Sequence, residues 1–196
     1  AKGVRSEFIG YEALLADAAT IRSLAIAGRK VDEAREGSEV EIVLDRTPFY
    51  PEGGGQVGDR GDITTPEGRA MVADTQAAAP GVIVMIGTVV DGVVRVGATA
   101  AARVDEQARR DTMRNHTGTH LLHAVLRRVL GDEVRQSGSL VHTPGLRFDF
   151  TFGRALTPAE VRRVEDDVNA AILENASVQA RVIPLPEALA SGALHL

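Results

Sequence analysis

Two histidines four residues apart are the side chains of this sequence best suited to chemistry. His116 and His120 lie in a stretch where apolar residues recur at helical spacing, and positions four apart share one face of a helix. Neutral imidazole nitrogens are good zinc ligands. The pair therefore predicts half of a metal site. The chain contains no cysteine, so no thiolate within it can complete that site.

A third histidine follows closely. His123 lies three residues after His120, on roughly the same helical face. We interpret it as a third ligand, as a group behind a ligand or facing a substrate, or as a partly buried residue without a chemical role. No glutamate stands between His116 and His120, whereas the paired histidines of zinc metalloproteases enclose one that acts as general base. The missing glutamate therefore excludes that class of enzyme.

Hydroxyl and amide side chains near the histidines could contact a bound polar group. Thr119 directly precedes His120, and Gln136 and Ser139 belong to the next predicted strand. If that strand runs beside the histidine helix, these side chains face the same ligand. The alternative is that they serve only the local strand and turn.

Three consecutive glycines form the second unusual feature. Gly53, Gly54 and Gly55 follow Phe49 and Tyr50, and glycine lets another backbone or a ligand approach closely. No Gly-Lys-Ser/Thr follows, which excludes a phosphate-binding P-loop. The segment is either a contact loop of this kind or a tight connection between strands.

The charge of the chain is uneven. The net charge of −5 argues against a protein held to nucleic acid by bulk electrostatics alone. Residues 109–196 nevertheless carry 11 arginines against 10 acidic residues and no lysine. Because arginine suits forked phosphate contacts, a local nucleic-acid surface or an ordinary solvated face is expected there.

The residues before position 105 have a composition and pattern typical of a β-domain. β-branched stretches alternate with glycine-rich turns, which predicts a compact β-barrel or sandwich. Asp91-Gly92 predicts a two-residue hairpin turn, and a short helix is expected over Tyr11–Ala16. The predicted strands are Ala19–Ile26, Glu39–Asp45, Ala70–Thr75, Val82–Val90 and Val93–Val104.

After position 105 the pattern becomes mostly helical. Thr157, Pro158 and Glu160 have the residue types of an N-cap, a first helical position and a capping box. The expected fold class is α+β: a small β-barrel domain over residues 1–104, then an α/β two-layer open-sheet domain over 105–196. The predicted elements after the barrel are helices over 105–115 and 116–130, strands Val134–Val141 and Leu146–Phe152, a helix to Asn175, a strand Val178–Ile183 and a short helix from Pro186.

No stretch of the sequence predicts a membrane location. The longest apolar runs are too short to span a bilayer, and no signal peptide follows the first residues. The absence of cysteine fits a cytoplasmic protein. The first residue is not Met, so we expect the chain to be a segment of a longer polypeptide.

Several motifs in register resemble the middle of bacterial alanyl-tRNA synthetases, over nearly the whole chain. The segments that carry the resemblance are Phe8–Tyr11, Asp45–Tyr50, Gly54–Asp59, Arg114–His123, Gln136–Val141, Arg147–Phe150 and Glu187–Ala193. The resemblance implies a linking β-barrel followed by the first part of an editing domain, related to the second additional domain of threonyl- and alanyl-tRNA synthetases. The chain stops before the downstream Cys-x-x-x-His segment that supplies the other two zinc ligands in that family.

The resemblance also implies an activity. In that family a separate catalytic domain, using ATP and Mg²⁺, ligates alanine to tRNA(Ala), and the editing domain hydrolyses Ser-tRNA(Ala) or Gly-tRNA(Ala). A second hydrolytic site is needed because an alanine pocket rejects similar small amino acids poorly. By this resemblance His116 and His120 bind Zn²⁺, and Thr119, Gln136 and Ser139 shape the catalytic pocket around the aminoacyl group.

Further expectations concern the partners. The loop of Gly53, Gly54 and Gly55 restricts substrates in free-standing relatives, and the parent enzyme is expected to be a homodimer through a C-terminal domain outside this chain. Candidate contacts with the tRNA acceptor end are Arg114, Arg127, Arg128 and Arg147. Two alternatives remain open: a free-standing trans-editing deacylase, and a non-catalytic tRNA-binding module.

Overall fold

The structure is a computed structural model that describes residues 4–179 and 182–191. The described residues form two compact units. The first comprises residues 4–116 together with 140–146, and the second comprises residues 117–139, 147–179 and 182–191. Helix α1 (Glu106–Leu130) therefore begins in the first unit and ends in the second.

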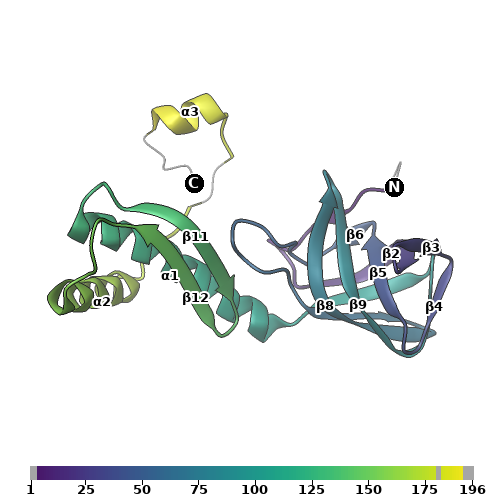
Figure 1. Cartoon of the computed structure of the whole chain (residues 1–196). Helices are drawn as coiled ribbons and strands as arrows, with labels where there is room; N and C mark the ends of the chain where they lie inside the picture. The colour runs from purple at the N-terminus through teal and green to yellow at the C-terminus, as the bar shows by residue number, and fades with distance from the viewer. Residues whose placement is uncertain (1–3, 180–181, 192–196) are drawn as a thin grey trace. The chain divides into compact units, whose positions relative to one another are not determined.

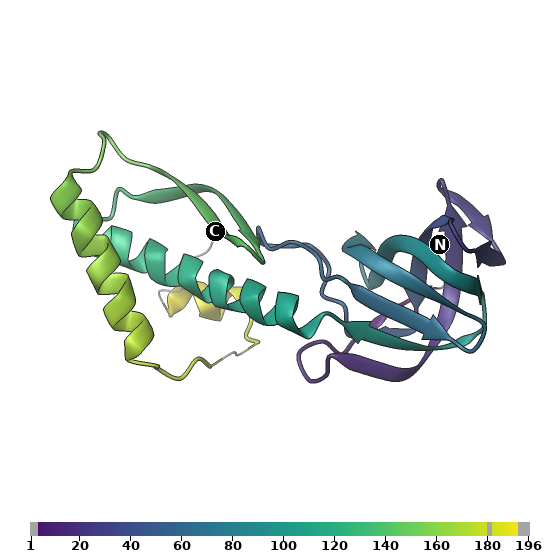
Figure 2. The same cartoon turned by 90° about the horizontal axis from the view of Figure 1, so that it is seen from below.

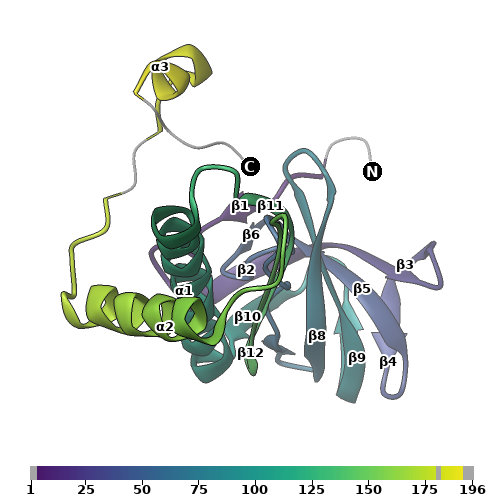
Figure 3. The ribbon, with the colours of Figure 1, turned by 60° about the vertical axis from the view of Figure 1, so that its left-hand side comes forward.

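A closed six-stranded antiparallel barrel forms the body of the first unit (Figures 1 and 3). Each strand pairs with the next, and the last returns to the first through Ala102↔Ala16 and neighbouring pairs, so neither edge is left open. In order around the barrel, the strands are β2 (Leu15–Ile26), β5 (Glu39–Leu44), β9 (Val82–Arg95), β8 (Gly68–Ala79), β7 (Gly61–Thr65) and β10 (Thr99–Val104).

Four short strands decorate the barrel. β3 (Arg29–Val31) extends β2 as a hairpin, and β4 (Glu33–Arg35) pairs with β9. β1 (Glu7–Phe8) and β6 (Arg46–Thr47) pair in parallel. The segment after β6 leads into the loop 50–59, which carries the three glycines.

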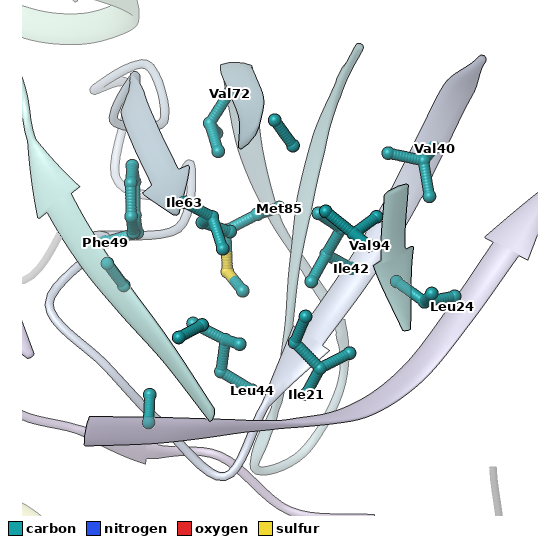
Figure 4. Packing of buried hydrophobic residues seen from close by; sticks show 14 of the residues in the cluster. Ile21, Leu24, Val40, Ile42, Leu44, Phe49, Ile63, Val72, Met85 and Val94 are labelled. Atoms are coloured by element: carbon teal, nitrogen blue, oxygen red, sulfur yellow. The ribbon is translucent and has the colours of Figure 1, made fainter. Parts of the chain in front are cut away.

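The barrel interior is filled by apolar side chains, most of them from alternate strand positions, with Phe49 added from the segment after β6 (Figure 4). Ile21, Leu44, Phe49, Ile63 and Met85 are all fully buried, and each such side chain contributes roughly 1.5–3 kcal/mol through burial. This alternation is what the β-branched pattern of the sequence predicts.

The second unit combines the C-terminal part of α1 with a crossing helix and with a β-hairpin, except for residues 140–146 at the hairpin tip, which belong to the first unit (Figure 2). The hairpin is β11 (Arg135–His142) and β12 (Gly145–Thr151), followed by α2 (Pro158–Leu173) and α3 (Leu185–Ala190). Val125 and Leu126 of α1 pack with Val134 and with Val164 of α2. The predicted combination of a small barrel followed by an α/β region is confirmed.

The predicted start of α2 is also confirmed. Thr157 is the N-cap, and its hydroxyl accepts a hydrogen bond from the backbone N–H of Glu160. The Glu160 carboxylate accepts one in return from the backbone N–H of Thr157, completing a capping box. Hydrogen bonds from Arg154, and from the backbone N–H and the hydroxyl of Thr157, lower the pKa of Glu160 to about 2.

Three local predictions in the barrel region are wrong. The segment Tyr11–Ala16 makes one turn and then enters β2, because Ala16 pairs with Ala102 in the barrel and that pairing overrides helix propensity. The predicted strands do not include β7 (Gly61–Thr65), because this strand begins at a glycine, which is typical of a turn. A Cβ at Gly61 would stand 2.1 Å from the Arg103 carbonyl oxygen, so glycine is required by close strand approach.

The predicted hairpin turn at Asp91-Gly92 is absent, and β9 runs through it unbroken. Gly92 has φ 63° and pairs with Gly68 within the ladder. The register shift that follows lies between Asp91 and Val89, so the bulged residue is Val90. The predicted strand Val178–Ile183 includes residues 180–181, which lie outside the described residues. The described part of that segment forms no strand.

Candidate functional site

Helix α1 places both candidate ligands on one continuous element. The sequence predicts two helical pieces, and the structure joins them into a single helix from Glu106 to Leu130. His116 and His120 are therefore one turn apart, as an i, i+4 pair. Glu106 in the first turn and two arginines in the last complement the helix dipole.

The ring of His116 is held by a residue of the barrel domain. The Nδ1 atom of His116 lies 2.7 Å from the Oε1 atom of Gln56, which is only 5% exposed. An amide oxygen can only accept, so Nδ1 carries the proton and donates it to Gln56. In this tautomer Nε2 is the nitrogen with the lone pair, and it is the one able to bind a metal.

The glycine loop is the element that carries Gln56. Gly53 and Gln56 exchange two backbone hydrogen bonds of 3.0 Å, closing a tight turn. Gly54 and Gly55 have φ values of 59° and 80°, a region that favours glycine. The glycine run thus has a conformational reason, which agrees with the tight-turn interpretation, and its end positions Gln56.

Asn115, the residue before His116, joins helix α1 to the hairpin tip. Its amide donates to the carbonyl oxygens of His142 and Thr143, at 2.8 and 3.2 Å. Thr112 Oγ1 lies 3.5 Å from Thr143 Oγ1. The helix around His116 is therefore held from two sides.

The proposed pocket residues lie on two elements. Thr119, on α1, is 6% exposed. On β11 the Gln136 amide donates to Ser139 Oγ at 3.3 Å. These two β11 side chains are therefore hydrogen-bonded to each other.

The four arginines proposed for tRNA contact all form ion pairs within the described chain. Three of them are more than half exposed, and Arg127 is 27% exposed. Such surface pairs contribute little, about 0–1 kcal/mol, so exchange of an acidic partner for a phosphate is inexpensive. The pairs are Arg114–Asp111, Arg127–Asp132, Arg128–Asp167 and Arg147–Asp149.

The donor set accounts for part of a zinc site. A ligating histidine usually donates its other ring N–H to an oxygen, and the bond from His116 to Gln56 has this form. Over residues 4–179 and 182–191, however, no three His, Cys, Asp or Glu side chains come together in a way that could hold a metal. His123 therefore does not complete the pair as a third ligand within this part of the chain.

His123 is buried instead beside the hairpin. It is 8% exposed, its ring lies 5.1 Å from that of Phe148, and its Nε2 has no hydrogen-bond partner among the described residues. Burial, followed by the charges of Arg127 and His120, lowers the pKa of His123 below its ordinary 6.5. The side chain is thus held neutral in the folded protein.

The lowered pKa of His123 predicts a pH-dependent stability. Below about pH 6.5 the unfolded chain takes up a proton at His123 that the folded chain accepts only at lower pH, so stability falls as pH decreases. Urea unfolding measured from pH 8 to pH 5 should show this decline. The variant His123→Leu removes the titration and should flatten it; an unchanged slope would contradict the assignment.

Sequence reasoning missed three polar side chains of this region. Gln56 appeared only as part of a motif, and the buried ion pair of Asp59 with Arg109 was not anticipated. Both interactions join residues at least 50 positions apart. No local pattern marks them, apart from the glycine run before Gln56.

No helix of the described residues is long and apolar enough to cross a membrane.

Comparison with known proteins gives consistent similarities. Residues 2–108 match the model of the family tRNA synthetases class II (A). The chain is 50% identical over 191 residues to an alanine–tRNA ligase of Thermus thermophilus, covering 97% of the chain and 21% of that protein. It is 48% identical to that of Thermotoga sp. and 45% identical to that of Polynucleobacter asymbioticus, each over 195 residues, 100% of the chain and 22% of the relative. The chain thus spans about a fifth of these relatives.

Proposed function

The chain belongs to the family of tRNA synthetases class II (A), and from this premise we propose that it serves as part of the editing module of an alanine–tRNA ligase. The parent enzyme would ligate alanine to tRNA(Ala) with ATP, in the cytoplasm. The module would hydrolyse the ester bond of tRNA(Ala) mischarged with serine or glycine. The observation that carries the proposal is the histidine pair on α1, with one ring anchored through Nδ1 by Gln56.

The proposed roles follow from the side chains. His116 and His120 would hold Zn²⁺ through imidazole nitrogens, together with ligands from a further segment. A zinc ion there supplies a Lewis acid that polarises the ester carbonyl or lowers the pKa of a water molecule. Burial of His116's partner Gln56 keeps the ring in one orientation while substrate binds.

The joined side chains of β11 would recognise the aminoacyl group. A serine hydroxyl can bond to the amide of Gln136 or the hydroxyl of Ser139, whereas the methyl of alanine cannot. Such a bond would favour serine over alanine. Glycine, which has no side-chain hydroxyl, would be admitted by its smaller size alone. Thr119, buried on α1, would line the same pocket.

Phosphate contacts would orient the acceptor end of tRNA(Ala). Arg114, Arg127, Arg128 and Arg147 are the candidates, because their present partners are surface carboxylates that phosphates can replace. Contacts of this kind position the nucleic acid without reading its sequence.

A second candidate function has one observation in its favour. The described residues gather no group of three metal ligands, so the chain by itself could bind tRNA without hydrolysing the ester. In that case the histidine pair and the β11 side chains would contribute to docking alone.

The test is hydrolysis of Ser-tRNA(Ala), with Ala-tRNA(Ala) as the cognate control. The chain is compared with a longer version that includes a downstream Cys-x-x-x-His segment, each with and without added zinc. Zinc-dependent hydrolysis of Ser-tRNA(Ala) in the longer version supports the proposal, and activity in both versions shows that the two histidines suffice. Absence of hydrolysis in both, with tRNA binding retained, would establish the binding module instead.

A further inference from the structure

We infer that Gln56, in the barrel domain, is a positioning residue for the metal-binding histidine His116. The inference rests on the proposed function only in taking His116 as a ligand. Gln56 Oε1 and His116 Nδ1 are 2.7 Å apart although the residues are separated by 60 positions. The pair brings a loop of the barrel to the helix that carries the candidate site.

Gln56 is fixed by its backbone on both sides. The Gly55 carbonyl accepts from the Val141 N–H at 2.8 Å, and the Val57 N–H donates to the Val141 carbonyl at 3.0 Å. Gln56 and Val141 therefore form an isolated parallel bridge. Because the backbone is held at Gly55 and at Val57, the Cα of Gln56 is fixed, and its side-chain amide can reach only nearby partners.

The turn before Gln56 needs the glycines for its backbone alone. A Cβ at Gly54 would meet no atom within 4 Å, yet φ at Gly54 is +59°, which side-chain-bearing residues seldom adopt. The turn closes through the two backbone bonds between Gly53 and Gln56. The conformation of this turn thus fixes the backbone position from which the Gln56 side chain extends.

The far end of the loop is tied to the same helix as His116. Asp59 accepts a hydrogen bond of 2.7 Å from the Tyr50 N–H and is ion-paired with Arg109. Arg109 lies on α1, about two turns before His116. Both ends of the contact are therefore tied to α1: His116 lies on it, and the loop that carries Gln56 is joined to it through Asp59 and Arg109.

A hydrogen-bond acceptor such as Gln56 affects metal affinity because it sets the tautomer and the orientation of the imidazole ring. Free histidine in water favours the tautomer protonated at Nε2, whereas the bond to Gln56 requires the proton on Nδ1 and leaves Nε2 as the ligand atom. Removing such an outer partner typically weakens metal binding 10–100-fold. A carboxylate in place of the amide would also accept from Nδ1, with a stronger charge-assisted bond.

The experiment uses the longer version of the chain, which includes the downstream Cys-x-x-x-His segment, with four substitutions, of which His116→Ala removes the candidate ligand itself. Gln56→Ala removes the acceptor, Gln56→Glu retains one, and Gln107→Ala is the matched control, since Gln107 is an exposed glutamine of α1 bonded to Asp111. Zinc affinity is measured by competition with a chromophoric chelator, and the tautomer of His116 by ring ¹⁵N shifts in the metal-free protein. The midpoint of thermal unfolding establishes that each variant is folded.

We expect Gln56→Ala to weaken zinc binding roughly 10–100-fold and to move the His116 proton toward Nε2. Gln56→Glu should retain the Nδ1–H tautomer and bind zinc at least as tightly as wild type, and Gln107→Ala should match wild type in both readouts. If wild-type zinc binding depends on His116 but Gln56→Ala changes neither affinity nor tautomer, the positioning role is overturned and the proposed function stands. If His116→Ala leaves zinc affinity unchanged, the proposed ligand role fails, and this inference fails with it.

Discussion

Replacing Arg109 with alanine is expected to lower the free energy of unfolding by about 3–5 kcal/mol, because it leaves a buried carboxylate without its partner. Arg109 and Asp59 are each 6% exposed. The guanidinium bonds to both carboxylate oxygens and also donates to the Gly10 and Pro48 carbonyls, at 2.9 and 2.8 Å. One buried side chain thus satisfies four acceptors.

Urea unfolding of the variant, with the m-value checked for two-state behaviour, measures this loss. The matched control is Arg95→Ala, since Arg95 pairs with Glu33 and Glu67 at the surface, and its removal should cost only about 0–1 kcal/mol. Replacing both buried partners, as Arg109→Met with Asp59→Leu, should cost less than Arg109→Ala alone. Equal losses for Arg109→Ala and Arg95→Ala would show that the buried pair does not hold the loop to α1.

The barrel could be predicted from the sequence because its interior follows a two-residue period. Strands such as β5 and β9 alternate or run as apolar stretches, and turn residues separate them. The pattern could not show whether an individual glycine marks a turn or lies within a strand. Gly61 and Gly92 permit close approach of neighbouring strands, which depends on pairing between distant segments and has the same local signature as a turn.

The part of the candidate site that lies on a helix could be predicted from the sequence, because helical spacing is a local property. The spacing of His116 and His120 places them one turn apart whatever the rest of the fold does, and the N-cap at Thr157 is likewise local. The partner of His116 depends instead on how the barrel loop closes against Val141. A contact across 60 residues leaves no periodic trace in a single sequence.

The residue patterns predicted elements of the fold, whereas the family resemblance supplied the roles of the candidate site residues. Barrel, helix and hairpin follow from composition and spacing. The assignment of Thr119, Gln136 and Ser139 to a pocket came from family resemblance and stays a prediction. The structure adds that Gln136 bonds to Ser139.

Substituting either candidate ligand should remove editing while tRNA binding persists. His116→Ala or His120→Ala would delete one imidazole of an i, i+4 pair and so leave the metal site one ligand short. Loss of several kcal/mol of transition-state stabilisation corresponds to roughly a 10³-fold fall in the rate of Ser-tRNA(Ala) hydrolysis. Affinity for tRNA should change little, because phosphate contacts from arginines provide most of it.

The measurement pairs deacylation rate with tRNA affinity at fixed salt, in the version of the chain that hydrolyses the ester. His123→Leu is the matched control on the same helix, because the His123 ring packs beside Phe148 and its Nε2 has no hydrogen-bond partner among the described residues. That variant should keep both zinc and activity. Rates for His116→Ala and His120→Ala within a few-fold of wild type would mean that hydrolysis does not run through the histidine pair. A parallel fall in tRNA affinity would instead assign the two rings to docking, because a ligand of the metal acts on the ester and not on the phosphates.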